Sequence, residues 1–583
     1  MFCTTKIYCQ NIYLVLDNKP NANIVVLDKA NKHLNGVAKE LENYIFESTK
    51  AKLKIVNCIN SNVYNIIIAT QYNKGVAINY KVMDDDGFII MTSGKNVVIS
   101  GKSDYGTEYG VYDFLEKYVG VKWLMPTELW TEVPIAKNLS VEKISVENNP
   151  KFLSRSFFNI NMENHNAQLA EWGRHNRLRN RIDFHHNLIN LFDSDIIKKS
   201  HPSFLPVVKG IKYVPSNKKD YKWQPNFKAQ GLDTYAAKEI IKYFNLNPGK
   251  HSYSLGVNDT DAFDDSNTAG KKNYVEKENF SDAYYSWVNR TVRIVNKSIP
   301  NKKFGLLAYN SVAEPPTFKL EKNVVPFLTY ERLLWLDPSL RQKDIEFSTR
   351  WGNSASEFGW YDYVYGSIYL VPRVYFSHYQ DYLKMAYRLN VRYYVGEYYP
   401  NWIEGPKGWI MTKLLWDPNQ NLDSLLNEWY VSAVGTASAS HLKKFYEIWE
   451  EVWTRDMPNS SWWKKKGGTM LRFNDQSYVN DISFDKIQRA DKLLKLVYTS
   501  AVTKKQKERA KDLIEMWEFS KMNYLYFRQK DSSLLKILTQ EQKAINAKIV
   551  TKKDIDHKIE KLKKHPLYMT IINYYTIPHR VKY

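Results

Sequence analysis

The first part of the chain alternates short apolar runs with helical patterns. Residues 24–27 predict a strand, and the apolar side chains of residues 34–45 then recur at helical spacing. The runs KLKIV and YNIIIAT predict two more strands, and GFIIM and NVVIS flank a turn around Gly94, as the two arms of a hairpin do. Residues 109–119 place apolar side chains on one helical face. We therefore predict a small α/β domain over residues 1–148.

From Phe152 onward, apolar or aromatic runs alternate with polar residues and helical patterns, as βα units do. Seven runs predict strands: FLSRSFFNI, HNLINLF, HSYSLGV, KFGLLAY, NVVPFLT, FGWYDYV and RYYVGEY. An eighth strand, third in order, is placed in the weakly patterned stretch between Lys212 and Leu232. Eight such units in about 250 residues match the size of a closed barrel. We expect an α/β fold with a central (β/α)8 TIM barrel over residues 149–430.

Beyond about residue 430 the strand pattern ends and helical periodicity replaces it. Apolar side chains recur at helical spacing from Leu513 to Trp517, and Tyr524 and Phe527 continue the stripe. The sequence thus predicts a C-terminal helical domain over residues 431–583.

Composition limits the classes of function. No stretch approaches the roughly 20 apolar residues that a membrane span requires, so none is expected. The formal net charge is +21, but the lysines are scattered, and their densest run, from Lys504 to Lys564, has the spacing of solvated helix faces. We therefore expect no nucleic-acid partner, and among polyanions we favour an acidic polysaccharide over DNA. The 42 tyrosines and 17 tryptophans suit the stacking of sugar rings, although core packing accounts for most of them.

Other chemistries lack their signatures. Cys3, Cys9 and Cys58 show no metal-ligand spacing, so neither a zinc site nor a disulfide framework is predicted. There is no glycine-rich phosphate loop after a strand and no G-x-S-x-G motif, which argues against a nucleotide site and a serine nucleophile. We predict no cofactor and no metal. The N-terminus lacks the pattern of a clear signal peptide.

Several carboxylates follow predicted barrel strands, where the active sites of such barrels lie. The candidates are Asp259 after SLGVN, Glu331 after FLTY, Asp362 in GWYDYV and Glu397 after YYVG. Glycosidic cleavage needs one acid to protonate the leaving oxygen, and a second carboxylate or a substrate group at the sugar carbon. Asp259 and Glu397 are favoured because small or polar residues flank them, whereas Asp362 lies among aromatic residues that also suit a core.

A second group of residues suits substrate binding. Arg174 and His185 belong to a cluster rich in arginine and histidine, which suits a carboxylate or sulfate held by charge-assisted hydrogen bonds. Arg155, in the first barrel strand, is expected to point into the barrel mouth or to pair with a buried acid. The remaining candidates for the sugar subsite are Asn310, Trp360, Tyr363 and Trp402.

Ordered sequence blocks carry a family resemblance over roughly residues 20 to 450. The run SGKSDYGTEYGVYDFLEKYVGVKWLMPTELWTEVP resembles the end of the N-terminal domain of α-glucuronidases and β-N-acetylhexosaminidases, and above all that of bacterial proteins with domain of unknown function 4838. HPSFLPVVKG, SLGVND, LLAYNSVAEPP and GEYYPNW resemble further blocks of that family. The resemblance implies an exo-acting glycoside hydrolase of polysaccharide-degrading bacteria, located in the periplasm or at the cell surface.

The resemblance also implies roles for individual residues. Related enzymes place the general acid at the end of the fourth barrel strand, which corresponds to Asp259. In a hexosaminidase-like enzyme Asn258 would polarise the acetamido group of the substrate, whereas in an α-glucuronidase-like enzyme Glu397 or Asp362 would be the base. The chain departs from its relatives because no cysteine follows the Asn258–Asp259 pair, and because relatives usually have Glu at the acid position.

Two other functions remain open from the sequence. A barrel with aromatic platforms but no productive acid and base would only bind glycan. A polysaccharide lyase would instead use Tyr, His or Arg side chains near a uronate. The sugar, the linkage, the stereochemical outcome and the oligomeric state are not predicted.

Overall fold

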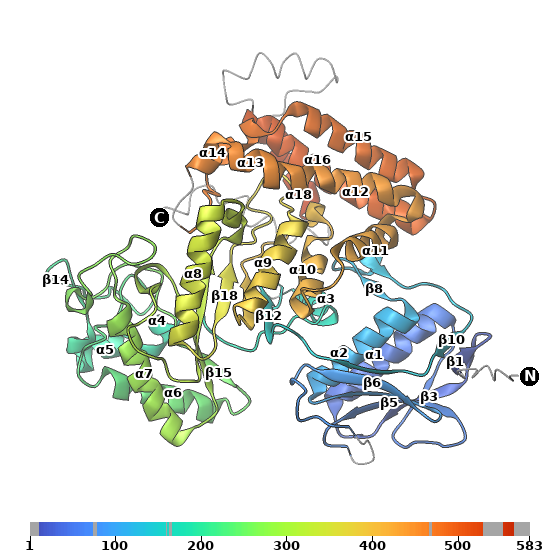
Figure 1. Cartoon of the computed structure of the whole chain (residues 1–583), viewed down its shortest axis with the longest axis horizontal. Coiled ribbons are helices and arrows are strands. Elements are labelled where there is room, and N and C mark those ends of the chain that lie inside the picture. The colour runs from blue at the N-terminus through green and yellow to red at the C-terminus, as the bar shows by residue number, and fades with distance from the viewer. Residues whose placement is uncertain are drawn as a thin grey trace, which may run out of the picture.

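The computed structural model describes residues 11–73, 78–158, 160–162, 166–465, 469–528 and 552–564. Figure 1 shows three regions in chain order: a sheet with two covering helices, a curled sheet with helices outside it, and a helical C-terminal part. Cys58 is an exposed free cysteine, whereas Cys3 and Cys9 lie outside the described residues. The domain limits at residues 148 and 430 stay a prediction.

The N-terminal region is built on a six-stranded sheet in the order β11-β6-β7-β5-β3-β4. Its strands are β3 (Ala22–Val26), β4 (Lys54–Val56), β5 (Tyr64–Thr70), β6 (Phe88–Ser93), β7 (Asn96–Gly101) and β11 (Ser145–Asn148). The predicted hairpin is confirmed, because β6 and β7 pair antiparallel with Ser93 opposite Asn96. A smaller sheet joins β1 (Ile12–Leu16), β2 (Lys19–Pro20) and β10 (Leu139–Val141), and β8 (Lys122–Trp123) pairs with β9 (Thr131–Glu132).

Helices α1 (Lys32–Thr49) and α2 (Asp104–Phe114) cover one face of the six-stranded sheet (Figure 1). Each begins at a polar cap: Asn31 accepts a hydrogen bond from Leu34 N, and Ser103 accepts one from Gly106 N. The apolar stripe of α1 is buried in the main core, as its helical spacing predicts.

The central region is a curled parallel sheet of six strands in the order β12-β19-β18-β17-β16-β15. Its strands are β12 (Ser154–Phe157), β15 (Ser252–Ser254), β16 (Lys303–Ala308), β17 (Val324–Tyr330), β18 (Gly359–Asp362) and β19 (Tyr393–Gly396). Each neighbouring pair is parallel. Helices packed outside it are α6 (Leu232–Leu246), α7 (Ser281–Ser298), α8 (Pro338–Ser354), α9 (Phe376–Arg388) and α10 (Lys407–Trp416). The described residues thus form a half-barrel, and a closed eight-stranded barrel is not confirmed.

The two predicted strands that would close the barrel are wrong. The run HNLINLF forms the short helix α4 (Leu188–Leu191), and the stretch between Lys212 and Leu232 carries no barrel strand. Residues 179–187 instead cross the open side of the sheet, where Arg179 and Arg155 exchange backbone hydrogen bonds of 2.9 Å. Periodicity could not separate an apolar strand from a short buried helix here.

The crossing segment passes so close to the sheet that only glycine fits beneath it. A Cβ atom on Gly305 would lie 2.4 Å from the carbonyl oxygen of Asp183, and one on Gly256 would lie 2.5 Å from that of His185. Phe184 projects into the half-barrel and stacks on Phe327 with ring centroids 4.2 Å apart. The segment therefore fills the interior that a closed barrel would pack with strand side chains.

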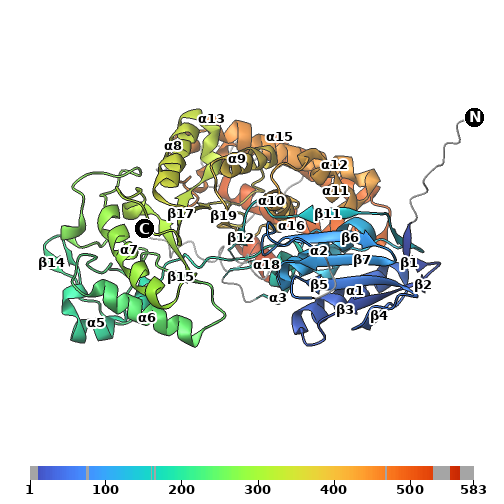
Figure 2. The same cartoon turned by 60° about the horizontal axis from the view of Figure 1, so that its bottom comes forward.

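The C-terminal region is helical, as predicted. Its main helices are α11 (Leu422–Val434), α12 (Thr436–Glu451), α15 (Phe484–Ser500), α16 (Lys504–Arg528) and α18 (Lys552–Leu562), with α12, α15 and α16 packed together (Figures 1 and 2). Helix α16 also reaches the N-terminal region, because Arg509 donates to the carbonyl of Leu129 at 2.6 Å. None of the helices in the described part of the chain is long and apolar enough to cross a lipid bilayer.

Candidate active site

The carboxyl ends of the half-barrel strands surround a cavity of about 560 Å³. It is lined by Phe158, His185, His186, Asp259, Leu307, Tyr309, Asn310, Thr329, Tyr361, Tyr363, Tyr365, Glu397, Tyr399 and the segment 470–474. Its volume is in the usual range for small-molecule sites, and its lining includes two carboxylates and five tyrosines. Five predicted site residues are thus brought together: Asp259, Glu397, His185, Asn310 and Tyr363.

Glu397 is the more firmly held of the two carboxylates. It follows β19 directly, and its backbone N–H donates to the carbonyl of Asp362 at 2.8 Å. Tyr399 donates its hydroxyl to Oε1 at 2.8 Å, while Tyr361 and Tyr365 donate to Oε2 at 2.8 and 3.5 Å. Burial raises the pKa of Glu397, and the charge of Asp259 adds to this, whereas the three hydroxyls act in the opposite direction. The result is an oriented carboxylate that is a stronger base than a solvated one.

Asp259 presents its carboxylate to the cavity from an exposed position after β15. No hydrogen-bond donor from the described residues holds this carboxylate, so it is open to a ligand. The preceding Asn258 is buried and does not line the cavity; its Oδ1 accepts from Ile189 N at 2.9 Å and its Nδ2 donates to the carbonyl of Trp223 at 2.8 Å. Asn258 therefore supports the loop and does not face the substrate, which corrects its predicted role.

Two adjacent histidines form the floor of the cavity near Asp259. Burial, with a smaller effect of His186, lowers the pKa of His185 to about 3, so its ring is neutral at physiological pH. The Nδ1 atom of His186 contacts the carbonyl oxygen of Val257, so in the neutral ring it carries the proton and Nε2 is an acceptor. Asn310 adds an amide from the loop after β16.

The segment 470–474, which we call the wall, comes from the C-terminal helical region and closes the cavity opposite the strands. Glu331 holds it at two points: its backbone N–H donates to the carbonyl of Thr469 at 2.9 Å, and its Oε2 accepts from Leu471 N at 2.6 Å. Its Oε1 pairs with the buried Arg373. Glu331 is fully buried and does not line the cavity, so its predicted catalytic role is corrected to that of an anchor for the wall.

Two residues of β18 also face away from the cavity. Asp362 is buried, with Oδ1 accepting from Arg332 N and Oδ2 from the hydroxyl of Tyr394, both at 2.9 Å. Trp360 is fully buried under the guanidinium of Arg332, which lies 3.7 Å from its ring centroid. Neither residue can contact a substrate in this structure, because side chains on a strand alternate between its two faces.

The remaining predicted binding residues join the half-barrel to its neighbours. Arg155 is buried and pairs with Asp86 of the N-terminal region at 2.6 Å, which is the second of the two placements expected for it. Arg174 pairs with Glu40 at 2.7 Å and also contacts Glu108. Trp402 is 2% exposed and packs edge-on against Trp172. The predicted binding of a substrate anion by Arg174 is thus corrected, since its guanidinium already pairs with two protein carboxylates and contacts the hydroxyl of Tyr112.

The sequence reasoning missed most of the tyrosines. Tyr361, Tyr363 and Tyr365 stand two residues apart, so the period of a strand places them on one face, and Trp360 and Asp362 on the other. The same period links Glu397 with Tyr399. This alternation, applied to the sequence, would have predicted that these tyrosines share one face with the cavity. No local signal pointed to the wall, which joins the site through tertiary contacts alone.

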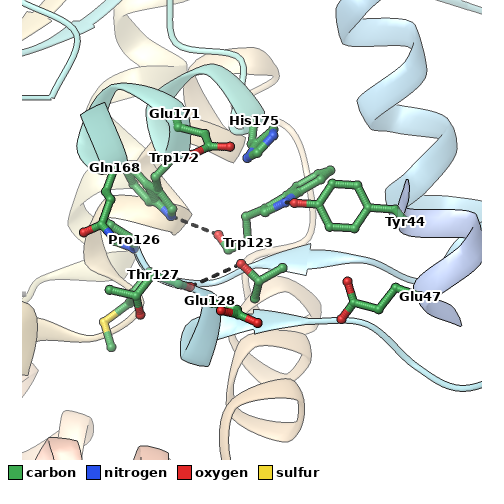
Figure 3. A pocket seen from close by; sticks show the side chains of 12 residues that line it. Tyr44, Glu47, Trp123, Pro126, Thr127, Glu128, Gln168, Glu171, Trp172 and His175 are labelled. Atoms are coloured by element: carbon green, nitrogen blue, oxygen red, sulfur yellow. Dashed lines mark hydrogen bonds between the residues drawn. The ribbon is translucent and has the colours of Figure 1, made fainter. Parts of the chain in front are cut away.

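A second cavity, of about 270 Å³, lies between α1, the turn before β9 and α3 (Ala167–His175) (Figure 3). Glu47, Glu128 and Glu171 line it, but its two tryptophans are buried, with Trp172 Nε1 donating to the carbonyl of Trp123 at 3.0 Å. It lies apart from Asp259 and Glu397, so we place the chemistry in the larger cavity. Among the described residues no group of three or more His, Cys, Asp or Glu side chains is arranged to hold a metal ion.

Sequence comparison identifies the family. Residues 125–447 match the domain of unknown function DUF4838. The chain belongs to the DUF4838 family. Residues 15–114 match the N-terminus of glycosyl hydrolase family 67, which agrees with the resemblance in the N-terminal sequence blocks. The comparison with curated proteins gave no match.

Solved structures with a similar fold are glycoside hydrolases. One is a GH115 4-O-methyl-α-glucuronidase with specificity for decorated arabinogalactans, 11% identical, with 97% of this chain and 80% of that chain covered at a TM-score of 0.60. Another is a GH138 enzyme that targets pectin rhamnogalacturonan II, 12% identical, with 96% and 92% covered at a TM-score of 0.53. The DUF4838 chain therefore has a glycoside hydrolase-like fold over nearly its whole length.

Proposed function

We propose that this DUF4838 protein is a glycoside hydrolase that acts on the non-reducing end of a glycan, with Asp259 and Glu397 as its acid and base pair. The observation that carries the proposal is that these two carboxylates, which follow different parallel strands, line one cavity together with five tyrosines. The glycoside hydrolase-like fold supports the reaction class. Action at the non-reducing end rests on the family resemblance and is part of the proposal.

The surroundings of the two carboxylates suggest how the roles divide. Glu397 is oriented by three hydroxyls and has a raised pKa, which suits a base that activates water or a nucleophile that attacks the sugar. Asp259 is exposed to the cavity and has no donor from the described residues, so a leaving oxygen can contact its carboxyl group, as the proposed acid role requires. The aromatic rings of Tyr363 and Tyr365 would pack against the sugar face.

The position of Asn258 favours a mechanism in which no acetamido group of the substrate takes part. Substrate-assisted cleavage needs a protein donor or acceptor that orients this group, and Asn258 is buried and does not line the cavity. We therefore favour an enzyme that is α-glucuronidase-like, in the sense of using two protein carboxylates, over a hexosaminidase-like one.

The test is release of monosaccharides from a panel of plant, algal and host glycans by the wild type, Asp259→Asn and Glu397→Gln. Loss of general acid catalysis lowers rates by about 10² to 10⁴, so turnover should nearly vanish in Asp259→Asn while binding of the same glycan persists. Asp261→Asn is a matched control, because Asp261 is exposed, pairs with Lys277 at 2.8 Å and does not line the cavity. Equal turnover in Asp259→Asn and Asp261→Asn would overturn the assignment.

One alternative draws on the same cavity. His185 lies in T-shaped contact with His186 and near Tyr361, and all three side chains line the cavity; histidine and tyrosine are the residue types that a lyase would use near a uronate. Ultraviolet absorbance of an unsaturated product would identify that reaction. Binding of glycans without any product would instead identify a carbohydrate-binding protein. By family analogy we also propose a location in the periplasm or at the cell surface, which cell fractionation would test.

A further inference from the structure

Among the described residues that line the large cavity, Arg472 is the only arginine or lysine. It lies on the wall, its side chain is exposed, and none of the carboxylates in the described part of the chain forms an ion pair with it. The other arginine close to the wall, Arg373, is buried and paired with Glu331. His185 does not replace this charge, since burial lowers its pKa to about 3. Arg472 thus brings an uncompensated positive charge to a cavity that already holds two carboxylates.

The wall that carries Arg472 is held on both sides of that residue. On one side Glu331 bonds to Thr469 and Leu471. On the other side, the ring of Phe473 packs edge-on against Tyr365, with centroids 5.2 Å apart. Further along, the Tyr478 hydroxyl accepts from Leu370 N at 2.7 Å. A backbone fixed in this way presents the guanidinium with less loss of conformational freedom on binding than a free loop would.

We propose that Arg472 selects glycan ends that carry an anionic group, a carboxylate or a sulfate, by pairing with that group inside the cavity. The guanidinium presents planar donors that match the two oxygens of such a group. Asp259 and Glu397 repel an anion, so the cavity needs a compensating cation to accept one, and Arg472 is the lining residue that supplies it. The inference deepens the proposed function and rests on it for the identity of the ligand as a glycan end.

The test measures binding without turnover, so that it does not depend on catalysis. All variants are made in the Asp259→Asn background, and calorimetry compares methyl glucuronide, glucose 6-sulfate and methyl glucoside as ligands. A hydrogen bond between charged groups contributes enough that Arg472→Gln should weaken binding of the preferred charged sugar by about 10- to 100-fold. Binding of methyl glucoside should stay within about twofold, and Arg472→Lys should restore part of the loss.

Arg455→Gln is the matched control, because Arg455 belongs to the same helical region, is exposed and does not line the cavity. It should bind all three sugars as the background does. A loss confined to methyl glucuronide identifies a carboxylate as the preferred group, and a loss confined to glucose 6-sulfate identifies a sulfate. Equal binding by the background and Arg472→Gln, or no preference of the background for either charged sugar, overturns the proposal. Hydrolysis by the wild type is scored separately, so the proposed function can fail while the selectivity of Arg472 stands.

Discussion

Removing the hydroxyl of Tyr399 is expected to move the acidic limb of the pH–rate profile to higher pH. This hydroxyl donates to Oε1 of Glu397 at 2.8 Å, and it stabilises the ionised carboxylate. Burial already raises the pKa of Glu397, so Tyr399→Phe takes away one of the groups that hold it down. If Glu397 must be ionised to act, activity is lost as the pH falls through its pKa, and a higher pKa brings that loss at a higher pH.

The expected size follows from the strength of the lost bond. A hydrogen bond to an ionised group contributes about 1.5 to 3 kcal/mol, and a pKa change of one corresponds to about 1.4 kcal/mol. The acidic limb should therefore move upward by about one to two pH units. Oε2 keeps its two donors, Tyr361 and Tyr365, so the carboxylate should stay in place.

The assay is kcat/KM as a function of pH on an aryl glycoside of the sugar that the wild type releases, since this profile reports the ionisation of the free enzyme. Tyr393→Phe is the control: Tyr393 starts the same strand, but its hydroxyl donates to Glu357 at 3.1 Å and does not line the cavity. Its profile should match the wild type. An acidic limb of Tyr399→Phe that stays in place or moves to lower pH would refute the role of Glu397 as the ionised group.

Three further outcomes are expected from the packing and charges. Glu116 is buried with Arg177 and Lys413, and although burial opposes its ionisation, these cations hold its pKa at about 2. In urea titrations, Glu116→Gln should therefore lower the free energy of unfolding by about 3 to 5 kcal/mol at pH 7. The loss should be smaller at pH 3, where the carboxylate contributes less to stability. Burial raises the pKa of Glu331 to about 7 from 4.5, so its contribution to stability is lost as the pH rises between these values, and Glu331→Gln should remove that part of the pH dependence of Tm. Gly305→Ala should lower the free energy of unfolding by about 1 to 3 kcal/mol, because the added Cβ would meet the carbonyl oxygen of Asp183. Gly249→Ala is the control: its Cβ would have open space around it, so Tm should stay nearly unchanged.

The elements that the sequence predicts well are those whose local pattern agrees with their final environment. Strands β15 to β19 are apolar runs buried in a parallel sheet, and the hairpin of β6 and β7 has its turn at Gly94. The prediction failed over residues 186–192, the run HNLINLF, where the chain has just crossed the half-barrel and forms a short helix. That path depends on Gly256 and Gly305 in strands far along the sequence, which no local window contains.

The candidate site was predictable only in part, for a similar reason. Asp259 and Glu397 follow apolar strands directly, and this position was enough to place them at the cavity. Glu331 has the same sequence context as Glu397, because each follows a strand, yet Glu331 points into the protein, where Arg373 and the wall surround it. A carboxylate that follows a strand is thus located at the end of the sheet where the cavity lies. Whether it lines the cavity or is buried in the protein depends on the side of the strand from which it projects.

The cavity is formed by two regions of the chain, the half-barrel and the wall from the C-terminal helical region. The match to DUF4838 ends at residue 447, whereas the wall begins at residue 470. Asp259 and Glu397 therefore lie within the matched stretch, and Arg472 lies beyond it. The family match therefore covers the half-barrel with its two carboxylates and does not extend to the wall. Because the wall is attached to the half-barrel through Glu331, we expect a substitution of the exposed Arg472 to change the proposed selection of glycan ends while Asp259 and Glu397 keep their places.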